Sequence, residues 1–242
     1  MRIVTLNTWK NEGQYERRLA LMAEGLGELE PDVVCLQECF QADGFDTARH
    51  LADALGLDAA LAPARHKLRA HQGRRIESAS GLAILRRNGA LASGRLALPS
   101  DPADGERIGQ WADVAPGLRV LNLHLTHLRG PQASSLRAAQ LAKALAAARR
   151  PGAGLIVAGD LNAPADAPDL AQIAAALDLA AAPTLQGERD GHPAYPGAID
   201  HLALVDSGGW AIRRRFRALD RPDAEGWHPS DHAAVVADLE RR

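Results

Sequence analysis

Acidic, amide and histidine side chains fall beside the apolar runs of this sequence that have the character of strands. They are Asn7, Glu38, His124, Asp160, Asn162, Asp200, Asp231 and His232. Carboxylate and amide oxygens suit Mg²⁺ or Mn²⁺ better than Zn²⁺, and Mg²⁺ commonly keeps water ligands while it takes up substrate phosphate. These residue types therefore favour metal-assisted hydrolysis of a phosphate ester.

Other common chemistries lack their residues. No serine lies in a Gly-x-Ser-x-Gly pattern, and the two cysteines, Cys35 and Cys39, have no histidine near them in sequence. Phosphate-binding Gly-x-x-x-x-Gly-Lys and dinucleotide-binding Gly-x-Gly-x-x-Gly patterns are also absent. Two cysteines are too few for a disulfide framework or a four-thiolate metal site, so we expect reduced thiols.

The near-zero net charge argues against a protein that binds nucleic acid through an overall positive charge. The 242 residues include 28 Lys+Arg and 30 Asp+Glu, a formal net charge of −2. No apolar run is long enough to span a membrane, and residues 1–7 lack the features of a signal peptide. We therefore expect a cytoplasmic protein. No linker or repeat divides the chain, which predicts a single domain over residues 1–242.

Hydrophobic periodicity predicts short strands that alternate with amphipathic helices. The expected helices are Gln14–Leu29, Pro131–Arg149 and Asp169–Leu177. The expected strands are Ile3–Leu6, Asp32–Leu36, Gly81–Leu85, Leu91–Leu98, Trp111–Ala115, Leu118–Thr126, Leu155–Ala158, Leu202–Val205 and Ala233–Leu239. This order predicts an opening β-α-β unit and mixed sheets, and it leaves residues 43–73 and 181–198 without an assignment.

The direction of the strands decides whether the polar residues meet. Asn7, Glu38 and Asp160 follow expected strands, whereas Asp200 and Asp231 precede them. If the late strands run antiparallel to the early ones, all these positions lie at one edge of the sheets. The sequence then predicts a single polar cleft.

Several short motifs occur in the order found in one known family. The chain resembles the endonuclease/exonuclease/phosphatase superfamily, which includes deoxyribonuclease I, exonuclease III and neutral sphingomyelinases. The matching segments span nearly the whole chain and are Leu6-Asn7, Leu36-Gln37-Glu38, Ser80 to Leu85, Asn122 to His127, Gly159-Asp160-Leu161-Asn162, Ile199-Asp200-His201 and Ser230-Asp231-His232.

The resemblance implies a fold and a cofactor. The fold is α/β (α+β), a four-layer sandwich in which two packed mixed β-sheets are flanked by helices. The cofactor is Mg²⁺ or Mn²⁺, with Glu38, Asn7 and Asp231 as metal-binding residues.

The resemblance also implies roles for the remaining site residues. Asp160 and Asn162 would orient or deprotonate the attacking water, and His232, oriented by Asp200, would contact the scissile phosphate. His124 would be a second phosphate ligand or acid. His127 is a weaker candidate for substrate binding or a loop cap, and His201, of opposite strand parity to Asp200, is expected to be structural.

Positions Arg137 and Gln140 match a pattern frequent in the family, and solvation of a helix face explains them equally well. The triplet Asn7-Thr8-Trp9 departs from the Asn-x-Asp of abasic-site endonucleases, since Trp9 stands where that motif has an additional acidic metal ligand. This departure favours a phosphodiesterase or phosphatase.

The expected partner is a phosphate-ester substrate, with a small molecule or lipid headgroup favoured, and the expected state is a monomer. Two alternatives stay open. A nuclease could use the cationic residues Arg213, Arg214, Arg215, Arg217 and Arg221 against a nucleic-acid backbone. A non-catalytic module could keep the fold and bind a phosphate ligand.

Overall fold

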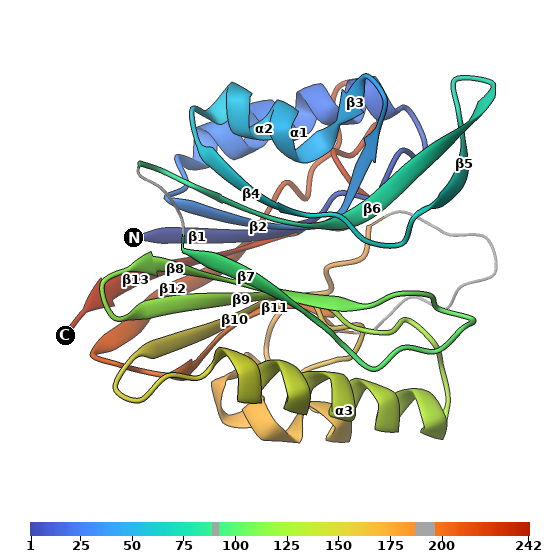
Figure 1. Cartoon of the computed structure of the whole chain (residues 1–242). Helices are drawn as coiled ribbons and strands as arrows, with labels where there is room; N and C mark the ends of the chain where they lie inside the picture. The colour runs from blue at the N-terminus through green and yellow to red at the C-terminus, as the bar shows by residue number, and fades with distance from the viewer. Residues whose placement is uncertain (89–91, 187–196) are drawn as a thin grey trace.

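The computed structural model describes residues 1–88, 92–186 and 197–242. Two β-sheets pack face to face, and each carries helices on its outer side (Figure 1). The layers are thus helices, an eight-stranded sheet, a five-stranded sheet and helices again. The expected four-layer α/β sandwich with mixed sheets is confirmed.

The eight-stranded sheet has the strand order β12-β13-β1-β2-β6-β4, with β3 paired to β2 and β5 to β6. Its strands are β1 (Arg2–Asn7), β2 (Val33–Ala42), β3 (Phe45–Asp46), β4 (Asp58–Ala62), β5 (Lys67–His71), β6 (Arg74–Arg86), β12 (Trp210–Ala218) and β13 (Ala234–Arg241). Strands β1 and β2 are parallel and are joined through helix α1 (Tyr15–Leu29), which is the expected β-α-β opening.

The five-stranded sheet has the order β11-β10-β9-β8-β7. Its strands are β7 (Ser93–Ala97), β8 (Ile108–Ala115), β9 (Leu118–His124), β10 (Gly154–Asp160) and β11 (Asp200–Asp206). Helix α3 (Pro131–Ala148) joins the parallel strands β9 and β10, and Pro131 opens it at a position where a missing N–H costs nothing.

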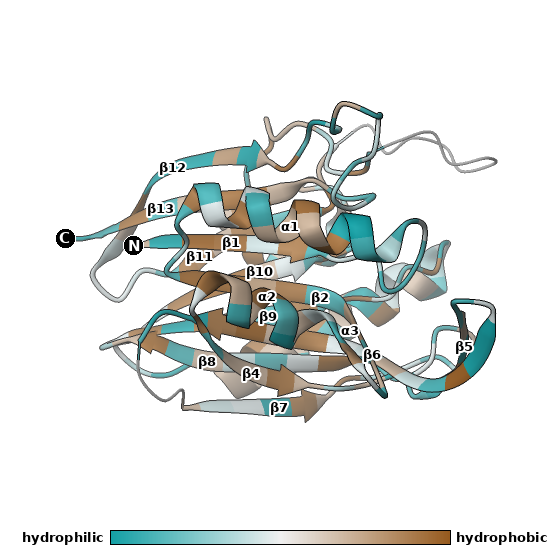
Figure 2. Cartoon of the chain, turned by 90° about the horizontal axis from the view of Figure 1, so that it is seen from above, coloured by the Kyte–Doolittle hydropathy of each residue, from teal (hydrophilic) through white to brown (hydrophobic). Residues whose placement is uncertain are grey.

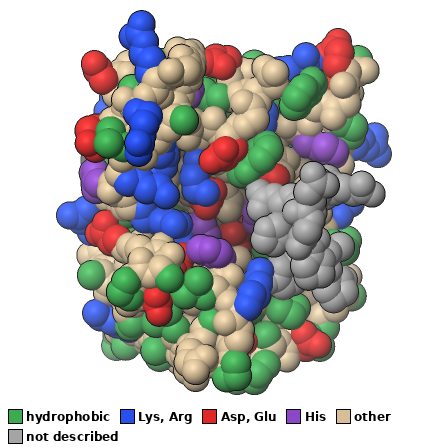
Figure 3. Space-filling model, turned by 90° about the vertical axis from the view of Figure 1, so that its right-hand side faces the viewer, with side chains coloured by type: hydrophobic (Ala, Val, Ile, Leu, Met, Phe, Trp, Pro, Cys, Tyr) green, Lys and Arg blue, Asp and Glu red, His purple; other side chains and the backbone are tan. Residues whose placement is uncertain are grey.

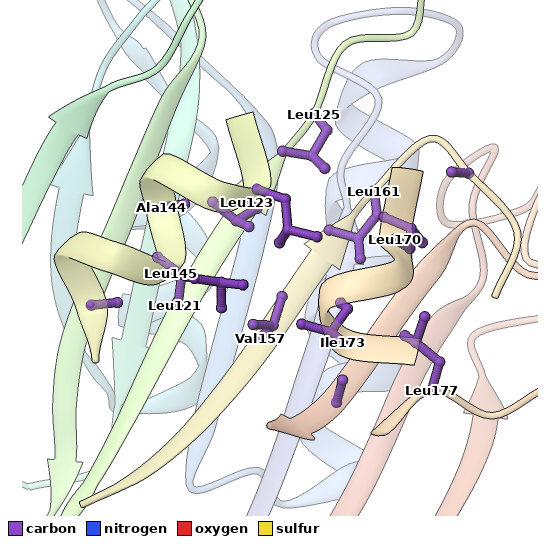
Figure 4. Close-up of a cluster of buried hydrophobic side chains, with 14 of the residues drawn as sticks. Leu121, Leu123, Leu125, Ala144, Leu145, Val157, Leu161, Leu170, Ile173 and Leu177 are labelled. Carbon is purple, nitrogen blue, oxygen red and sulfur yellow. The ribbon is translucent and has the colours of Figure 1, made fainter. Parts of the chain in front are cut away.

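Three apolar clusters hold the layers together. One lies between the sheets and includes Ile3, Ile84, Val120 and Ile156. Another joins α3 and the 3₁₀ helix η1 (Pro168–Ala176) to the outer side of β9 and β10 (Figure 4). The third packs α1 and α2 (Thr47–Leu55) on the other sheet. Apolar residues accordingly dominate the central strands in Figure 2. The polar end of the sheets is therefore supported by a packed apolar core.

Some elements differ from the expectation. The unassigned segment 43–73 contains β3, α2, β4 and β5, and α2 begins where the side chain of Asp46 accepts a hydrogen bond from the Arg49 N–H. The edge strand β12 was also not expected. The predicted helix Asp169–Leu177 is a 3₁₀ helix, because its apolar contacts recur every three residues, at Leu170, Ile173 and Ala176.

Candidate active site

The candidate residues meet at one end of the sheets because of the strand directions. β13 runs antiparallel to β1, and β11 runs antiparallel to β10. The carboxyl ends of β1, β9 and β10, which carry Asn7, His124 and Asp160, therefore adjoin the amino ends of β11 and β13. The Asn7 amide Nδ2 donates a hydrogen bond to Asp160 Oδ2 at 3.0 Å, which links the two sheets. Figure 3 shows this end, where acidic, basic and histidine side chains surround a hollow.

A β-bulge presents Glu38. Leu36 pairs with Ala83 and Cys39 with Gly81, so that Gln37 and Glu38 together face one residue of β6. Glu38 has the left-handed backbone angle φ 55°. An extra residue of this kind bends a strand and redirects a side chain. The expectation that Glu38 follows the end of a strand is wrong, since β2 continues to Ala42.

The turn after β10 is fixed by its own side chains. Gly159 has φ 132°, and a Cβ there would lie 1.9 Å from the Leu123 carbonyl oxygen, so that only glycine fits. Asn162 donates from its backbone N–H to Asp160 Oδ1 at 2.9 Å and from Nδ2 to the Leu125 carbonyl oxygen at 3.1 Å. The carboxylate of Asp160 is thereby held at the end of β10.

Asp160 is the centre of the group. Its Oδ2 lies 3.5 Å from His124 Nε2 and 3.9 Å from His232 Nε2. Burial and the negative charge of Asp200 raise the pKa of Asp160 to about 6, although the imidazolium of His232 and the hydrogen bond from Asn7 oppose the rise. A carboxylate with a pKa near neutrality is suited to accept a proton.

His232 and Asp200 form a buried pair. His232 Nδ1 lies 2.8 Å from Asp200 Oδ2, and the Thr184 hydroxyl oxygen accepts the backbone N–H of Asp200. Burial alone would lower the pKa of His232, but the charges of Asp200, Asp160 and Glu38 outweigh it and raise the pKa to about 9. The ring is therefore an imidazolium at neutral pH, with Nε2 directed to the side of Asp160.

Asp231 lies beside this pair. Its Oδ1 is 4.0 Å from His232 Nε2 and 3.4 Å from the Ser230 hydroxyl. The Ser230 hydroxyl donates to the backbone carbonyl of Asn7 at 2.6 Å. The segment before β13 is thus tied to the end of β1, and Asp231 faces the same cleft as Asn7.

His124 lies between Glu38 and Asp160. Its Nδ1 is 4.0 Å from Glu38 Oε1 and its Nε2 is 3.5 Å from Asp160 Oδ2. Burial and the positive charges of Arg107, Arg65 and Lys10 hold the pKa of His124 well below its usual value. The ring is neutral at neutral pH, which suits a hydrogen-bonding ligand better than an acid.

Lys10 is a cleft residue that the sequence interpretation missed. Its Nζ lies 3.0 Å from Glu38 Oε2. Burial opposes ionisation of Glu38, but the charge and the hydrogen bond of Lys10 overcome it and lower the pKa of Glu38. Glu38 is therefore ionised, and a lysine three residues after the Asn7 position was the available sequence signal.

His127 stands at the margin of the cleft. Its side chain is 53% exposed, and its Nδ1 lies 2.7 Å from Asp104 Oδ1. Arg107 binds the same carboxylate and donates to the carbonyl oxygen of His124 at 3.3 Å. Asp104 and Arg107 are both buried and were not predicted. His201 points elsewhere, with Nε2 2.9 Å from the carbonyl oxygen of Ala163, in keeping with the structural role expected for it.

Two buried side chains brace the loop after β9. Arg137 pairs with Asp169 and donates to the carbonyl oxygens of Thr126 and Leu128, whereas Gln140 accepts the Thr126 N–H at 2.9 Å. Both side chains are buried, so solvation of a helix face does not explain them.

Arg18 braces the loops on the opposite side of the cleft. It is fully buried on α1 and donates to the backbone carbonyls of Thr8, Glu12 and Pro229, at 2.9, 3.0 and 3.2 Å, and also to those of Trp9 and Lys10. These carbonyls belong to the loop after Asn7 and to the segment before Ser230. Burial lowers the pKa of Arg18 to about 10, so it remains charged at neutral pH.

The cysteines take no part in the cleft. Cys35 and Cys39 are free and buried in the apolar layers. Burial raises the pKa of both thiols far above neutrality, which removes the thiolate needed for nucleophilic attack.

The arginine-rich segment lies on the edge strand β12 and the turn after it. Arg213 pairs with Glu240 and Arg217 with Asp220, while Arg215 donates to the Ala176 carbonyl oxygen at 2.7 Å. Arg214 lies over the Phe216 ring, 4.3 Å from its centre. These contacts engage four of the five arginines within the molecule.

The oxygen-rich donor set fits a hard divalent cation. Asp160, Asp200 and His232 offer ligand atoms within 4.8 Å of one another, but His232 is an imidazolium without a free lone pair, so the two carboxylates are the donors of this group. Asp200 Oδ1 is also buried without a hydrogen-bond partner among the described residues. Of the expected metal-binding residues, Glu38 faces Lys10, and Asn7 Oδ1 accepts the Trp9 N–H. The compact group is thus made of other residues, next to the expected set.

The similarity to known proteins agrees with this arrangement. The sequence profile of the Endonuclease/Exonuclease/phosphatase family matches residues 4–232. The chain belongs to this family. Its members act on phosphate esters. No curated protein sequence gave a significant match.

Solved structures of family proteins share the fold over the whole chain. A Bacteroides vulgatus endonuclease/exonuclease/phosphatase has a TM-score of 0.73 and 18% identity, covering 100% of this chain and 98% of its own. The human Nocturnin catalytic domain has a TM-score of 0.70 and 20% identity, and the match covers 100% of this chain and 94% of that domain. A Bacteroides thetaiotaomicron mannosyl-6-phosphatase has a TM-score of 0.70 and 19% identity, and the match covers 99% of both chains.

No helix within the described ranges has both the length and the apolar character that crossing a bilayer requires.

Proposed function

We propose that this protein hydrolyses phosphate esters, by direct attack of water on phosphorus and with the help of a divalent metal ion. The observation that carries the proposal is the pairing of Asp160, whose pKa is raised to about 6, with the imidazolium of His232 3.9 Å away. A proton acceptor and a positive donor side by side are what such a reaction requires.

In this proposal the charge state of each residue determines its role in the reaction. Asp160 accepts the proton of the attacking water, and Asn162 fixes the carboxylate through its backbone N–H. The phosphoryl oxygens gain negative charge in the transition state, and His232 Nε2 donates to one of them while Asp200 holds the ring. His124, neutral, is a second hydrogen-bonding ligand. No side chain forms a covalent intermediate.

Glu38, Asn7 and Asp231 are the residues we propose for binding Mg²⁺ or Mn²⁺, and such an ion would supply Lewis-acid polarisation of a phosphoryl oxygen. Glu38 is ionised and redirected into the cleft by the bulge, which supports this assignment. Metal binding there requires Lys10 to leave the Glu38 carboxylate.

We propose a small molecule or lipid headgroup as the substrate, one domain over residues 1–242, and a monomer. The internal contacts of the arginines on β12 speak against a nucleic-acid surface there. The mannosyl-6-phosphatase among the similar structures is named for a small phosphate ester, in line with this preference. A nuclease remains the second candidate, because the family to which the chain belongs is named for nucleases as well as phosphatases.

The first test is hydrolysis of bis-p-nitrophenyl phosphate, p-nitrophenyl phosphate and supercoiled plasmid, each with EDTA, Mg²⁺ or Mn²⁺. Metal-dependent turnover should fall by orders of magnitude in Asp160→Asn and in His232→Ala, with unchanged circular dichroism. Asp206→Asn, on the far end of β11, is the matched control and should keep full activity. Full activity in Asp160→Asn would refute the proposal. Absence of turnover with all three, together with metal binding by calorimetry, would favour a phosphate-binding module.

A further inference from the structure

A second hollow opens beside the proposed reaction centre. It is open to solvent and encloses about 20 Å³, and its walls include Glu38, Glu106, His124, Arg65 and Arg107. Glu38 and His124 are also walls of the candidate active site. A group bound in this hollow would therefore be a near neighbour of the scissile phosphate.

Arg65 is held by its backbone while its guanidinium stays available. Its N–H donates to Glu106 Oε2 at 3.1 Å, and its carbonyl oxygen accepts a hydrogen bond from Arg69 at 3.0 Å. It has the left-handed angle φ 54°, which is uncommon for a residue other than glycine. Its guanidinium forms no hydrogen bond or ion pair with the residues that the structure describes. The loop thus presents a free cation to the hollow.

Arg69 adds a second positive charge behind the wall. Its guanidinium is buried, and among the described residues it binds neutral acceptors alone, the carbonyl oxygen and hydroxyl of Ser78, the hydroxyl of Ser80 and the carbonyl of Arg65. A buried charge without a counter-ion is costly. Arg107, by contrast, is neutralised by Asp104.

The cations around the hollow repel one another. Burial and the charge of Arg107 lower the pKa of Arg65, whereas Asp104 and Glu38 raise it, and burial and the charge of Arg65 lower the pKa of Arg69. Burial, Arg69 and Arg65 likewise lower the pKa of Lys67. The walls also carry the carboxylates of Glu38 and Glu106, and Arg107 is paired with Asp104, so Arg65 is the lining cation without a carboxylate partner among the described residues and is the group available to an anion.

We propose that this hollow is a subsite for a second phosphate group, bound by the guanidinium of Arg65, and that the preferred substrates are small molecules carrying two phosphates. The proposal rests on the proposed hydrolysis of phosphate esters. A phosphate dianion offsets the charges of Arg65 and Arg69, and a guanidinium binds it through two parallel hydrogen bonds.

Binding of methylphosphonate should be compared with that of bisphosphonates in which one, two or three methylene groups separate the phosphonates. Calorimetry at one fixed free Mg²⁺ concentration needs no turnover. The wild-type protein should bind the best bisphosphonate roughly 10- to 100-fold more tightly than methylphosphonate. This ratio should fall to within about threefold in Arg65→Met and to an intermediate value in Arg65→Lys, which keeps the charge without the two-pronged geometry.

Arg213→Met is the matched control, because Arg213 is an exposed arginine at the opposite end of the sheets, and it should keep the ratio. Melting temperatures identify a variant that fails to fold, and Arg65→Lys then carries the test. Chelation of Mg²⁺ by the bisphosphonate affects every variant equally and so cancels in the comparison.

The outcomes separate the subsite from the proposed function. Loss of the ratio in Arg65→Met supports the subsite even if no ester is hydrolysed, in which case only the proposed function fails. Hydrolysis of p-nitrophenyl phosphate without any preference for bisphosphonates overturns the subsite and leaves the proposed function standing. If the preference for the bisphosphonate over methylphosphonate is unchanged in Arg65→Met, the proposed subsite is overturned as well. Tighter Arg65-dependent binding of an oligonucleotide than of every bisphosphonate overturns the assignment to small molecules.

Discussion

Replacing Asp200 by asparagine should change the charge of His232 while leaving the fold intact. The carboxylate of Asp200 is the largest influence that raises the pKa of His232 to about 9, against burial, which lowers it. Without it, burial is opposed only by the charges of Asp160 and Glu38, and we expect the pKa to fall to near the ordinary 6.5. The fall corresponds to about 3 kcal/mol of lost imidazolium stabilisation.

The consequence for activity follows from the protonated fraction. At pH 7.5, His232 would pass from roughly 97% protonated to about 10%, so turnover should drop about tenfold on this account alone. The acid side of the pH profile should move little, because Asp160 loses both the repulsion of Asp200 and the attraction of the imidazolium.

The assay is a pH profile of kcat from pH 5 to 10, together with an NMR titration of the His232 ring in metal-free protein. Asp206→Asn serves as the control, since Asp206 pairs with Arg149 at the far end of the same strand. An alkaline limb that stays near pH 9 in Asp200→Asn, or a ring that still titrates there, would refute the reasoning.

Two other features of the cleft can be tested in the same way. Wild-type activity should fall below about pH 6, where Asp160 gains a proton, and above about pH 9, where His232 loses one; a flat profile across this range would contradict the assigned roles. Arg18→Met should lower the free energy of unfolding by about 2–4 kcal/mol, because it leaves several buried loop carbonyls without donors. Urea denaturation measures this loss, and an unchanged midpoint would show that Arg18 does not brace the loops.

Strand patterning was sufficient to predict the ends of the central strands. Asn7 and Asp160 end β1 and β10, and Asp200 begins β11, each within two residues of the strand end expected from the sequence. Burial fixes the faces of such strands, so their polar ends follow from local sequence, whereas the antiparallel direction of the late strands had to be assumed. The position of Glu38 was less predictable, because a bulge depends on pairing with β6, which is distant in sequence.

The residues missed by the sequence interpretation act through tertiary contacts. Arg65 and Arg69 lie in segment 43–73, which has little periodicity, and nothing local shows that one guanidinium is buried and the other free. Arg18 left a signal, since it occupies the buried helical stripe of Tyr15, Met22 and Leu26. An arginine within an apolar stripe marks a charge that must find partners inside the protein.

At the bulge, the residue that would be most stable and the residue that the proposed reaction needs are different. A left-handed residue costs glycine nothing and costs glutamate on the order of 1 kcal/mol, and its side chain also needs the charge of Lys10 to remain ionised. Random drift or laboratory selection for stability alone would therefore move position 38 toward glycine. A sequence-design method that scores only the fit to this backbone would treat the glutamate as an error, and the size of that disagreement measures how much stability this chain gives up to keep an acid at that point.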